Sequence, residues 1–157
     1  MKELPIHPSI YECQMEELTA QEQELVHQAI ASTENSYAPY SHFHVGAALL
    51  LDDGTTVPGC NQENAAFPAG LCAERSAIFA AGAAKPQAVP VMLAIGARDT
   101  TGQLTNDPVS PCGTCRQVII ETETRHHHPM RLLLYGKRCV YVMDGIQQLM
   151  PLSFTEF

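Results

Sequence analysis

The sequence has little charge, few aromatic side chains and no tryptophan. Of its 157 residues, 17% are charged, 6% are aromatic and 45% are hydrophobic, whereas about 25% charged residues are usual in soluble domains. The hydrophobic fraction excludes a disordered or fibrous chain. The low charge slightly favours burial of part of the surface against further copies of the chain. At this length we expect one domain, residues 1–157.

Basic residues are scarce as well. Nine Lys and Arg stand against 17 Asp and Glu, which gives a net charge of −8. Such a charge repels phosphate backbones, so a nucleic-acid polymer is not the expected partner. The first residues lack the basic start and apolar stretch of a secretion signal, and no apolar run approaches the roughly 18 residues of a membrane span. The sequence therefore predicts a soluble, cytoplasmic protein without a membrane partner.

Apolar periodicity and turn-forming residues predict an alternation of helices and strands. The expected helices are 20–35, 72–84, 112–123 and a short one at 145–150. The expected strands are 45–51 and 56–61, which form a hairpin, and 89–97, 131–135 and 138–142. This order indicates an α/β layered fold, in which helices cover a mixed central sheet of about five strands.

Six cysteines without an export signal are better interpreted as thiols or metal ligands than as a disulfide framework. Cys112 and Cys115 lie one turn apart at the start of an expected helix, where both can bind one tetrahedral metal ion. Cys72 opens the preceding helix in the same manner. If the two helix starts meet, three thiolates hold zinc and leave its fourth position to water, as in catalytic sites.

Glu74 follows Cys72 by two residues. A carboxylate beside a zinc-bound water can take its proton and pass it to a substrate nitrogen. Three thiolates on Zn²⁺ leave a net negative charge that weakens the metal as a Lewis acid, and Arg75 and Arg116 are expected to hydrogen-bond the sulfurs and offset it. A redox dithiol is the rival interpretation of the cysteine pair, but it gives no reason for Cys72 and Glu74.

These motifs resemble the small homo-oligomeric zinc-dependent cytidine deaminases, whose signature pairs Cys-x-Glu or His-x-Glu with Pro-Cys-x-x-Cys. Here the two parts are Cys72-Ala-Glu74 and Pro111-Cys-Gly-Thr-Cys115. The resemblance extends through residues 37–48, 59–66, 108–117 and 149–154, and residues 1–18 lie outside it. It implies a cytidine-deaminase-like fold with one zinc ion per subunit.

The resemblance also implies a nucleoside site. Phe43 would stack on the pyrimidine, Asn61 and Glu63 would bind the ribose hydroxyls, and the backbone at Ala73 would contact the base edge. Two short polar side chains just past the second hairpin strand also suit a diol on chemical grounds.

The same family completes each pocket with residues of neighbouring subunits. By this resemblance Phe67 and Phe154 would act across an interface, in a homotetramer with shared active sites. Residues 126–128, three consecutive histidines, are expected to form an exposed loop without a role.

The predicted reaction is hydrolytic deamination of cytidine or deoxycytidine to the uridine nucleoside with release of ammonia, in pyrimidine nucleoside salvage. Two alternatives stay open at this point. One is a deaminase of another amino-bearing base, such as blasticidin S or guanine. The other is a zinc-stabilised nucleoside-binding module without chemistry.

Overall fold

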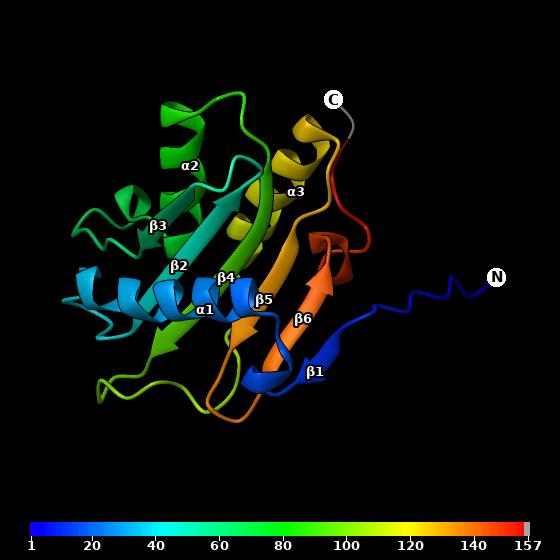
Figure 1. The fold of residues 1–157 in the computed structure, drawn as a ribbon. Helices are drawn as coiled ribbons and strands as arrows, with labels where there is room; N and C mark the ends of the chain where they lie inside the picture. Colours follow the sequence, from blue (N-terminus) through cyan, green and yellow to red (C-terminus); the bar gives the residue numbers. More distant parts are fainter. Residues whose placement is uncertain (156–157) are drawn as a thin grey trace.

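The structure, a computed structural model, describes residues 1–155 and contains one mixed six-stranded sheet with helices on both faces (Figure 1). The strand order is β1-β6-β5-β4-β2-β3. The strands are β1 (Tyr11–Cys13), β2 (His44–Leu51), β3 (Thr56–Cys60), β4 (Pro90–Arg98), β5 (Arg131–Tyr135) and β6 (Val140–Asp144). The helices are α1 (Ala20–Ser32), α2 (Ala73–Ala84) and α3 (Gly113–His126), and the short 3-10 helices are η1 (Met15–Glu17), η2 (Thr33–Asn35), η3 (Phe67–Ala69) and η4 (Ile146–Gln148). The predicted α/β layered fold is confirmed.

Alternate residues of the central strands build two separate cores. In β2, Ala47, Leu49 and Leu51 belong to the core under α2 and α3, whereas Ala48 and Leu50 belong to the core under α1. Successive side chains of a strand point to opposite faces, so a strand covered on both sides needs an uninterrupted apolar run. The run of residues 45–51 therefore predicts the three-layer arrangement as well as the strand.

Antiparallel pairs surround one parallel pair in the sheet. β2 and β3 form the predicted hairpin, and β2 also pairs antiparallel with β4. β4 and β5 run parallel, joined through α3. A parallel pair needs such a crossover, and the loop from β4 into α3 leaves the sheet at the carboxyl end of β4. This loop carries the Cys112 motif.

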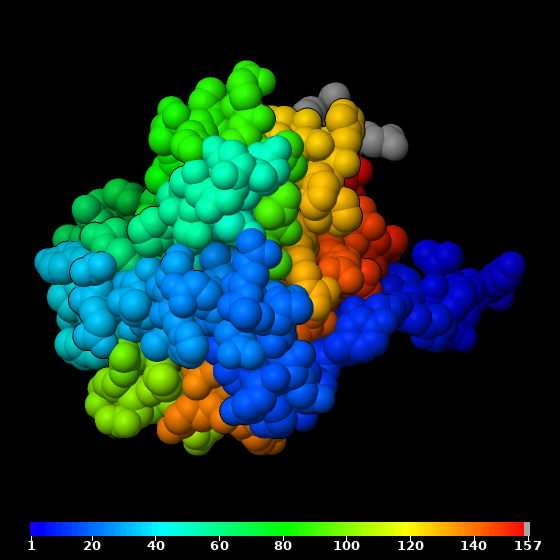
Figure 2. Space-filling view, viewed as in Figure 1, coloured from blue at the N-terminus to red at the C-terminus, as the bar shows by residue number. Residues whose placement is uncertain are grey.

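The sheet has six strands, one more than the five expected strands, because β1 adds an edge strand from the N-terminal segment. Tyr11 pairs with Val142 and Cys13 with Val140, which extends the sheet beyond β6. Residues 1–10 before it are exposed, and Figure 2 shows this dark blue segment standing away from the body of the protein. A three-residue strand is too short to show an alternating apolar pattern in the sequence, and it forms only because the edge of β6 offers hydrogen-bonding partners.

Several helix boundaries also differ from the expected ones. The first helix ends at Ser32, and η2 continues it in 3-10 geometry. α3 begins at Gly113 with Cys112 as its N-cap, one residue after the expected start. The same helix continues to His126, and His127, with a φ of +51°, is its C-cap. The expected final helix is only the single 3-10 turn η4.

No helix within residues 1–155 has the length and apolar character needed to span a bilayer.

The capping box of α1 makes stability depend on pH. The Glu22 carboxylate accepts hydrogen bonds from the Thr19 backbone and hydroxyl, both at 2.8 Å, and pairs with Arg131 of β5. Burial raises the pKa of Glu22, but the hydrogen bonds from Thr19 and Arg131 outweigh it and lower the pKa below the ordinary 4.5. A lowered pKa in the folded state means that the stabilisation is present above about pH 4.5 and is lost as the pH falls through the folded pKa.

Glu22→Gln is therefore expected to lower the free energy of unfolding by about 1–3 kcal/mol at pH 7, because charge-assisted hydrogen bonds are lost. The loss should be smaller in acid, at a pH below the lowered pKa of Glu22, where the wild-type carboxylate is itself protonated. Urea unfolding at both pH values measures this, with the exposed Glu24→Gln of the same helix as the control. Equal losses at both pH values would contradict the assignment.

Candidate active site

The N-terminal ends of α2 and α3 meet on the face of the sheet opposite α1 and bring the predicted ligands together. Cys72 is the N-cap of α2 and Cys112 the N-cap of α3, and neither thiol caps its own helix. Gly59 of β3 permits this packing, because a Cβ there would lie 2.3 Å from the Ala73 carbonyl oxygen. The first turn of α2 thus lies directly on the backbone of the hairpin.

The three sulfurs have the spacing of a tetrahedral metal site. The Sγ atoms of Cys72 and Cys112 are 3.8 Å apart, those of Cys112 and Cys115 are 3.5 Å apart, and all three lie within 4.8 Å of one another. Zinc–sulfur bonds of about 2.3 Å at tetrahedral angles require sulfurs about 3.8 Å apart. The cluster therefore fits zinc bound by three thiolates, with the fourth position left for a non-protein ligand.

No second cluster of this kind occurs among the described residues 1–155, and the three histidines at 126–128 join no such group. His126 is half-buried at the end of α3, and His127 and His128 are exposed.

Arg75 is the cation that contacts the sulfurs. Its Nη2 donates to Cys72 Sγ at 3.4 Å. The pKa of Cys72 is lowered to about 5, first by a hydrogen bond from the Cys115 thiol, with burial opposing and Arg75 adding to the lowering. The pKa of Cys115 is raised by the same contact and by burial.

The side chain of Arg116, predicted to hydrogen-bond the thiolates, donates instead to two backbone carbonyls. Nε donates to the Pro111 carbonyl and Nη1 to the Leu149 carbonyl, each at 2.8 Å. Both acceptors are backbone oxygens, one just before the metal-binding turn and one just after η4.

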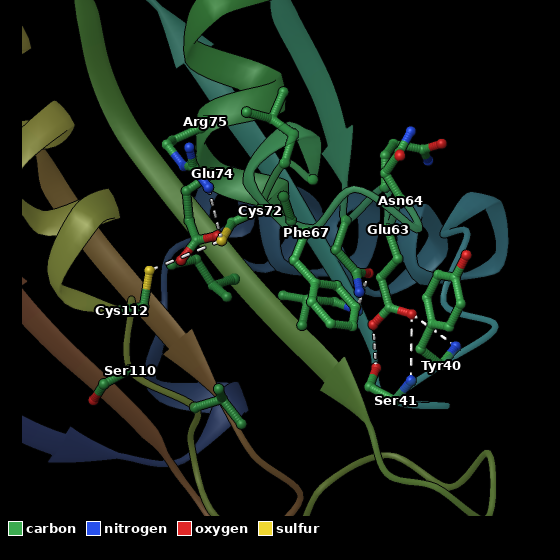
Figure 3. Close-up of a pocket in the computed structure, with 18 residues that line it drawn as sticks. Tyr40, Ser41, Glu63, Asn64, Phe67, Cys72, Glu74, Arg75, Ser110 and Cys112 are labelled. Carbon is green, nitrogen blue, oxygen red and sulfur yellow. Dashed lines mark hydrogen bonds between the residues drawn. The ribbon is translucent and has the colours of Figure 1, made fainter.

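Glu74 occupies the second residue of α2 and is only 4% exposed. Burial raises the pKa of its carboxyl group, and the neighbouring Cys72 adds to the increase. Figure 3 shows the carboxyl group beside the Cys72 sulfur. A buried carboxyl with a raised pKa, next to a metal site, is suited to accept and return a proton.

A cavity of about 630 Å³ opens beside this cluster. That volume is within the usual range for small-molecule sites. Four of the predicted substrate residues line it, together with Cys72 and Cys112 of the metal site and polar residues that local sequence patterns do not reveal. The lining includes Asn61, Glu63, Phe67, Ala73, Glu74, Arg75, Cys72 and Cys112, and also Tyr40, Ser41, Gln62, Asn64 and Ser110.

The two polar side chains expected at the ribose are already ordered by the protein. Glu63 accepts hydrogen bonds from the Tyr40 and Ser41 backbone and from the Ser41 hydroxyl, which lowers its pKa (Figure 3). Asn61 accepts from the Val45 amide at 2.8 Å and donates to the Phe43 carbonyl at 2.9 Å. An ionised carboxylate therefore faces the cavity, and the Asn61 amide fixes the start of β2 beside it.

The three predicted aromatic contacts are in different places. Phe67 lines the cavity of its own chain, 77% exposed, with its ring edge-to-face on Tyr40 at a centroid distance of 6.0 Å. Phe43 is half-buried and is not part of the cavity lining. Phe154 is 64% exposed on the C-terminal tail, outside this cavity.

Comparison with known proteins supports the metal site. The sequence model of the family described as "Cytidine and deoxycytidylate deaminase zinc-binding region" matches residues 19–128. The chain therefore belongs to this zinc-binding deaminase family, and its three-cysteine cluster fits a zinc site.

Named relatives and solved structures agree with this assignment. A cytidine deaminase of Sporosarcina psychrophila is 44% identical over 99 residues, which are 63% of this chain and 68% of the relative. One from Halalkalibacterium halodurans is 46% identical over 99 residues, 63% of this chain and 70% of the relative. The crystal structure of cytidine deaminase from Burkholderia pseudomallei superposes with a TM-score of 0.72 at 36% identity, over 87% of this chain and 100% of that one. The fold is thus that of the cytidine deaminase structures.

Proposed function

We propose that this protein catalyses the hydrolytic deamination of cytidine or deoxycytidine to the corresponding uridine nucleoside and ammonia. The observation that carries the proposal is a three-thiolate cluster with a buried carboxyl group, Glu74, at the wall of a nucleoside-sized cavity. The relatives named above are cytidine deaminases, which supports the same substrate class.

When bound by the three cysteines, zinc supplies the Lewis acidity that brings the pKa of water toward neutral. Glu74 takes a proton from the attacking water and delivers it to N3 of the pyrimidine, so that oxygen can add at C4. The same carboxyl group then carries the second proton to the amino group, which leaves as ammonia. Its burial excludes bulk water from these transfers.

In the proposed complex the nucleoside binds in this cavity. Glu63 accepts a hydrogen bond from a ribose hydroxyl, with Asn61 beside it, and the backbone at Ala73 contacts the base. Arg75 is the only Lys or Arg among the described residues of the lining, and it donates to Cys72. A nucleotide phosphate in this cavity would be repelled by the Glu63 carboxylate and would have no Lys or Arg to bind it apart from Arg75, which already donates to Cys72. The proposed substrate is therefore the nucleoside and not the nucleotide.

The proposal includes a homotetramer that acts in pyrimidine nucleoside salvage in the cytoplasm. In it, Phe154 of one subunit completes the cavity of a neighbour. Its exposure on the tail, away from the cavity of its own chain, supports this arrangement. Phe67 lines its own cavity, and its exposed ring is available to a neighbouring subunit as well.

The proposed function is tested by the loss of cytidine absorbance with purified protein, alongside zinc content per chain. Fast turnover with close to one zinc per chain is the expected result. One zinc without cytidine turnover would refute the substrate, and blasticidin S and guanine are then assayed in the same way. Bound nucleoside that is never converted would indicate a binding module instead.

Truncation of the tail tests the shared cavity. A chain ending at Ser153 is expected to raise the KM for cytidine about tenfold, because a buried aromatic contact of about 1.4 kcal/mol is lost. A chain ending at Phe154 is the matched control and should keep the wild-type KM. If both truncated proteins behave like the full chain, Phe154 has no part in binding.

A further inference from the structure

The C-terminal tail, residues 149–154, is held against α3 at two points by consecutive residues of that helix. Arg116 Nη1 donates to the Leu149 carbonyl at 2.8 Å, and Gln117 Nε2 donates to the Phe154 carbonyl at 3.0 Å. Figure 1 shows the red tail running beside α3. Both bonds go to backbone oxygens, so they fix the path of the tail whatever side chains it carries.

The same guanidinium also holds the metal-binding turn. Nε of Arg116 donates to the carbonyl of buried Pro111, and the Arg116 amide donates to the Cys112 carbonyl at 2.9 Å. Pro111 directly precedes the exposed Cys112, so its position sets where that ligand lies. One planar group thus connects the turn of a zinc ligand to a segment 33 residues further along the chain.

Lysine cannot reproduce this arrangement. A guanidinium presents several donors in a rigid fork and can bind two oxygens in fixed directions, whereas an ammonium is a point charge on a flexible stem. Arg75 donates to Cys72, whereas the fork of Arg116 is directed at the two carbonyls.

We propose that Arg116 is a positioning residue that couples the Cys112 turn to the Leu149 end of the C-terminal tail by holding both, so that both loosen when its guanidinium is lost. This inference rests on the proposed function because it assumes that Cys112 binds zinc. Because the tail also presents Phe154, Arg116 links the metal-binding turn to the residue assigned to a neighbouring cavity.

The test compares zinc-loaded wild type with Arg116→Met, Arg116→Lys and Gln117→Leu, and with Arg125→Met as a matched control on the exposed last turn of α3. Amide hydrogen exchange is measured for residues 149–154 and for β2 and β4, and zinc transfer is timed with a chromogenic chelator. In Arg116→Met the tail amides are expected to exchange about tenfold faster than in wild type. Zinc release is expected to be about 10–100-fold faster, which is the usual effect of losing a group that orients a metal ligand.

The remaining variants separate coupling from general destabilisation. Arg116→Lys should rescue part of both losses, Gln117→Leu should loosen the tail without changing zinc release, and Arg125→Met should match wild type. The proposal is overturned if Arg116→Met matches Arg125→Met in tail exchange or zinc release, or if exchange in β2 and β4 rises as much as in the tail.

Two further results keep the test decisive. If Arg116→Met does not fold, Arg116→Lys decides: faster exchange and faster zinc release support the coupling, and wild-type values for either refute it. A wild-type protein that binds zinc but does not deaminate cytidine defeats the proposed function, while the comparison among variants still tests the coupling.

Discussion

Glu74→Gln is expected to abolish turnover of cytidine while zinc and nucleoside remain bound. Gln has the size of Glu and can still donate and accept hydrogen bonds, but it cannot take a proton from water or return one to N3. Proton transfer by a positioned side chain contributes about 10²–10⁴-fold to a rate. Since one carboxyl group performs every transfer in the proposed reaction, we expect kcat to fall by at least about 10³-fold.

Three measurements separate a lost proton carrier from a damaged site. Zinc content should stay at one per chain, because Glu74 is not a ligand. Equilibrium binding of cytidine should change little, and the melting temperature should not fall, because Gln removes a carboxyl group whose pKa is raised by burial. Glu121→Gln, an exposed change on α3, is the control. Turnover near the wild-type rate in Glu74→Gln would exclude the proposed role.

The features that sequence predicts well are those set by neighbours along the chain. The apolar run of 45–51 and the Asp-Asp-Gly turn determine the hairpin locally, and Gly54 adopts the required positive φ of +82°. Thr19 and Glu22 define the start of α1 in the same way. The metal site was predictable because each half of it is a short motif at a helix start, although their meeting depends on the fold.

The features that were missed depend on partners far along the chain. Asn61 bonds to Phe43 and Val45, and Arg116 bonds to Leu149, so neither set of partners can be read from local spacing. Arg116 is the clearer case. Its position next to Cys115 suggests contact with a sulfur atom. A long side chain on a helix can equally reach groups that lie alongside the helix, and here the tail provides the Leu149 carbonyl oxygen.

Cys112→Ala is expected to remove zinc from the protein without unfolding it. Two thiolates remain, which are too few to hold zinc against competing ligands, so metal content should fall from about one per chain to below about 0.1. Turnover should disappear with the metal. Cys112 is exposed and makes no N-cap hydrogen bond, so alanine at this position removes little that stabilises α3.

Cys60→Ala is the matched control for this prediction. Cys60 is half-buried and donates to the Asn35 carbonyl, and it is not part of the three-sulfur cluster. This variant should keep wild-type zinc content and turnover, whereas Cys112→Ala should lose both and still show the circular dichroism of a folded α/β protein. If Cys112→Ala instead keeps a full complement of zinc, the metal is held by other residues, and the argument from three convergent thiolates fails with it.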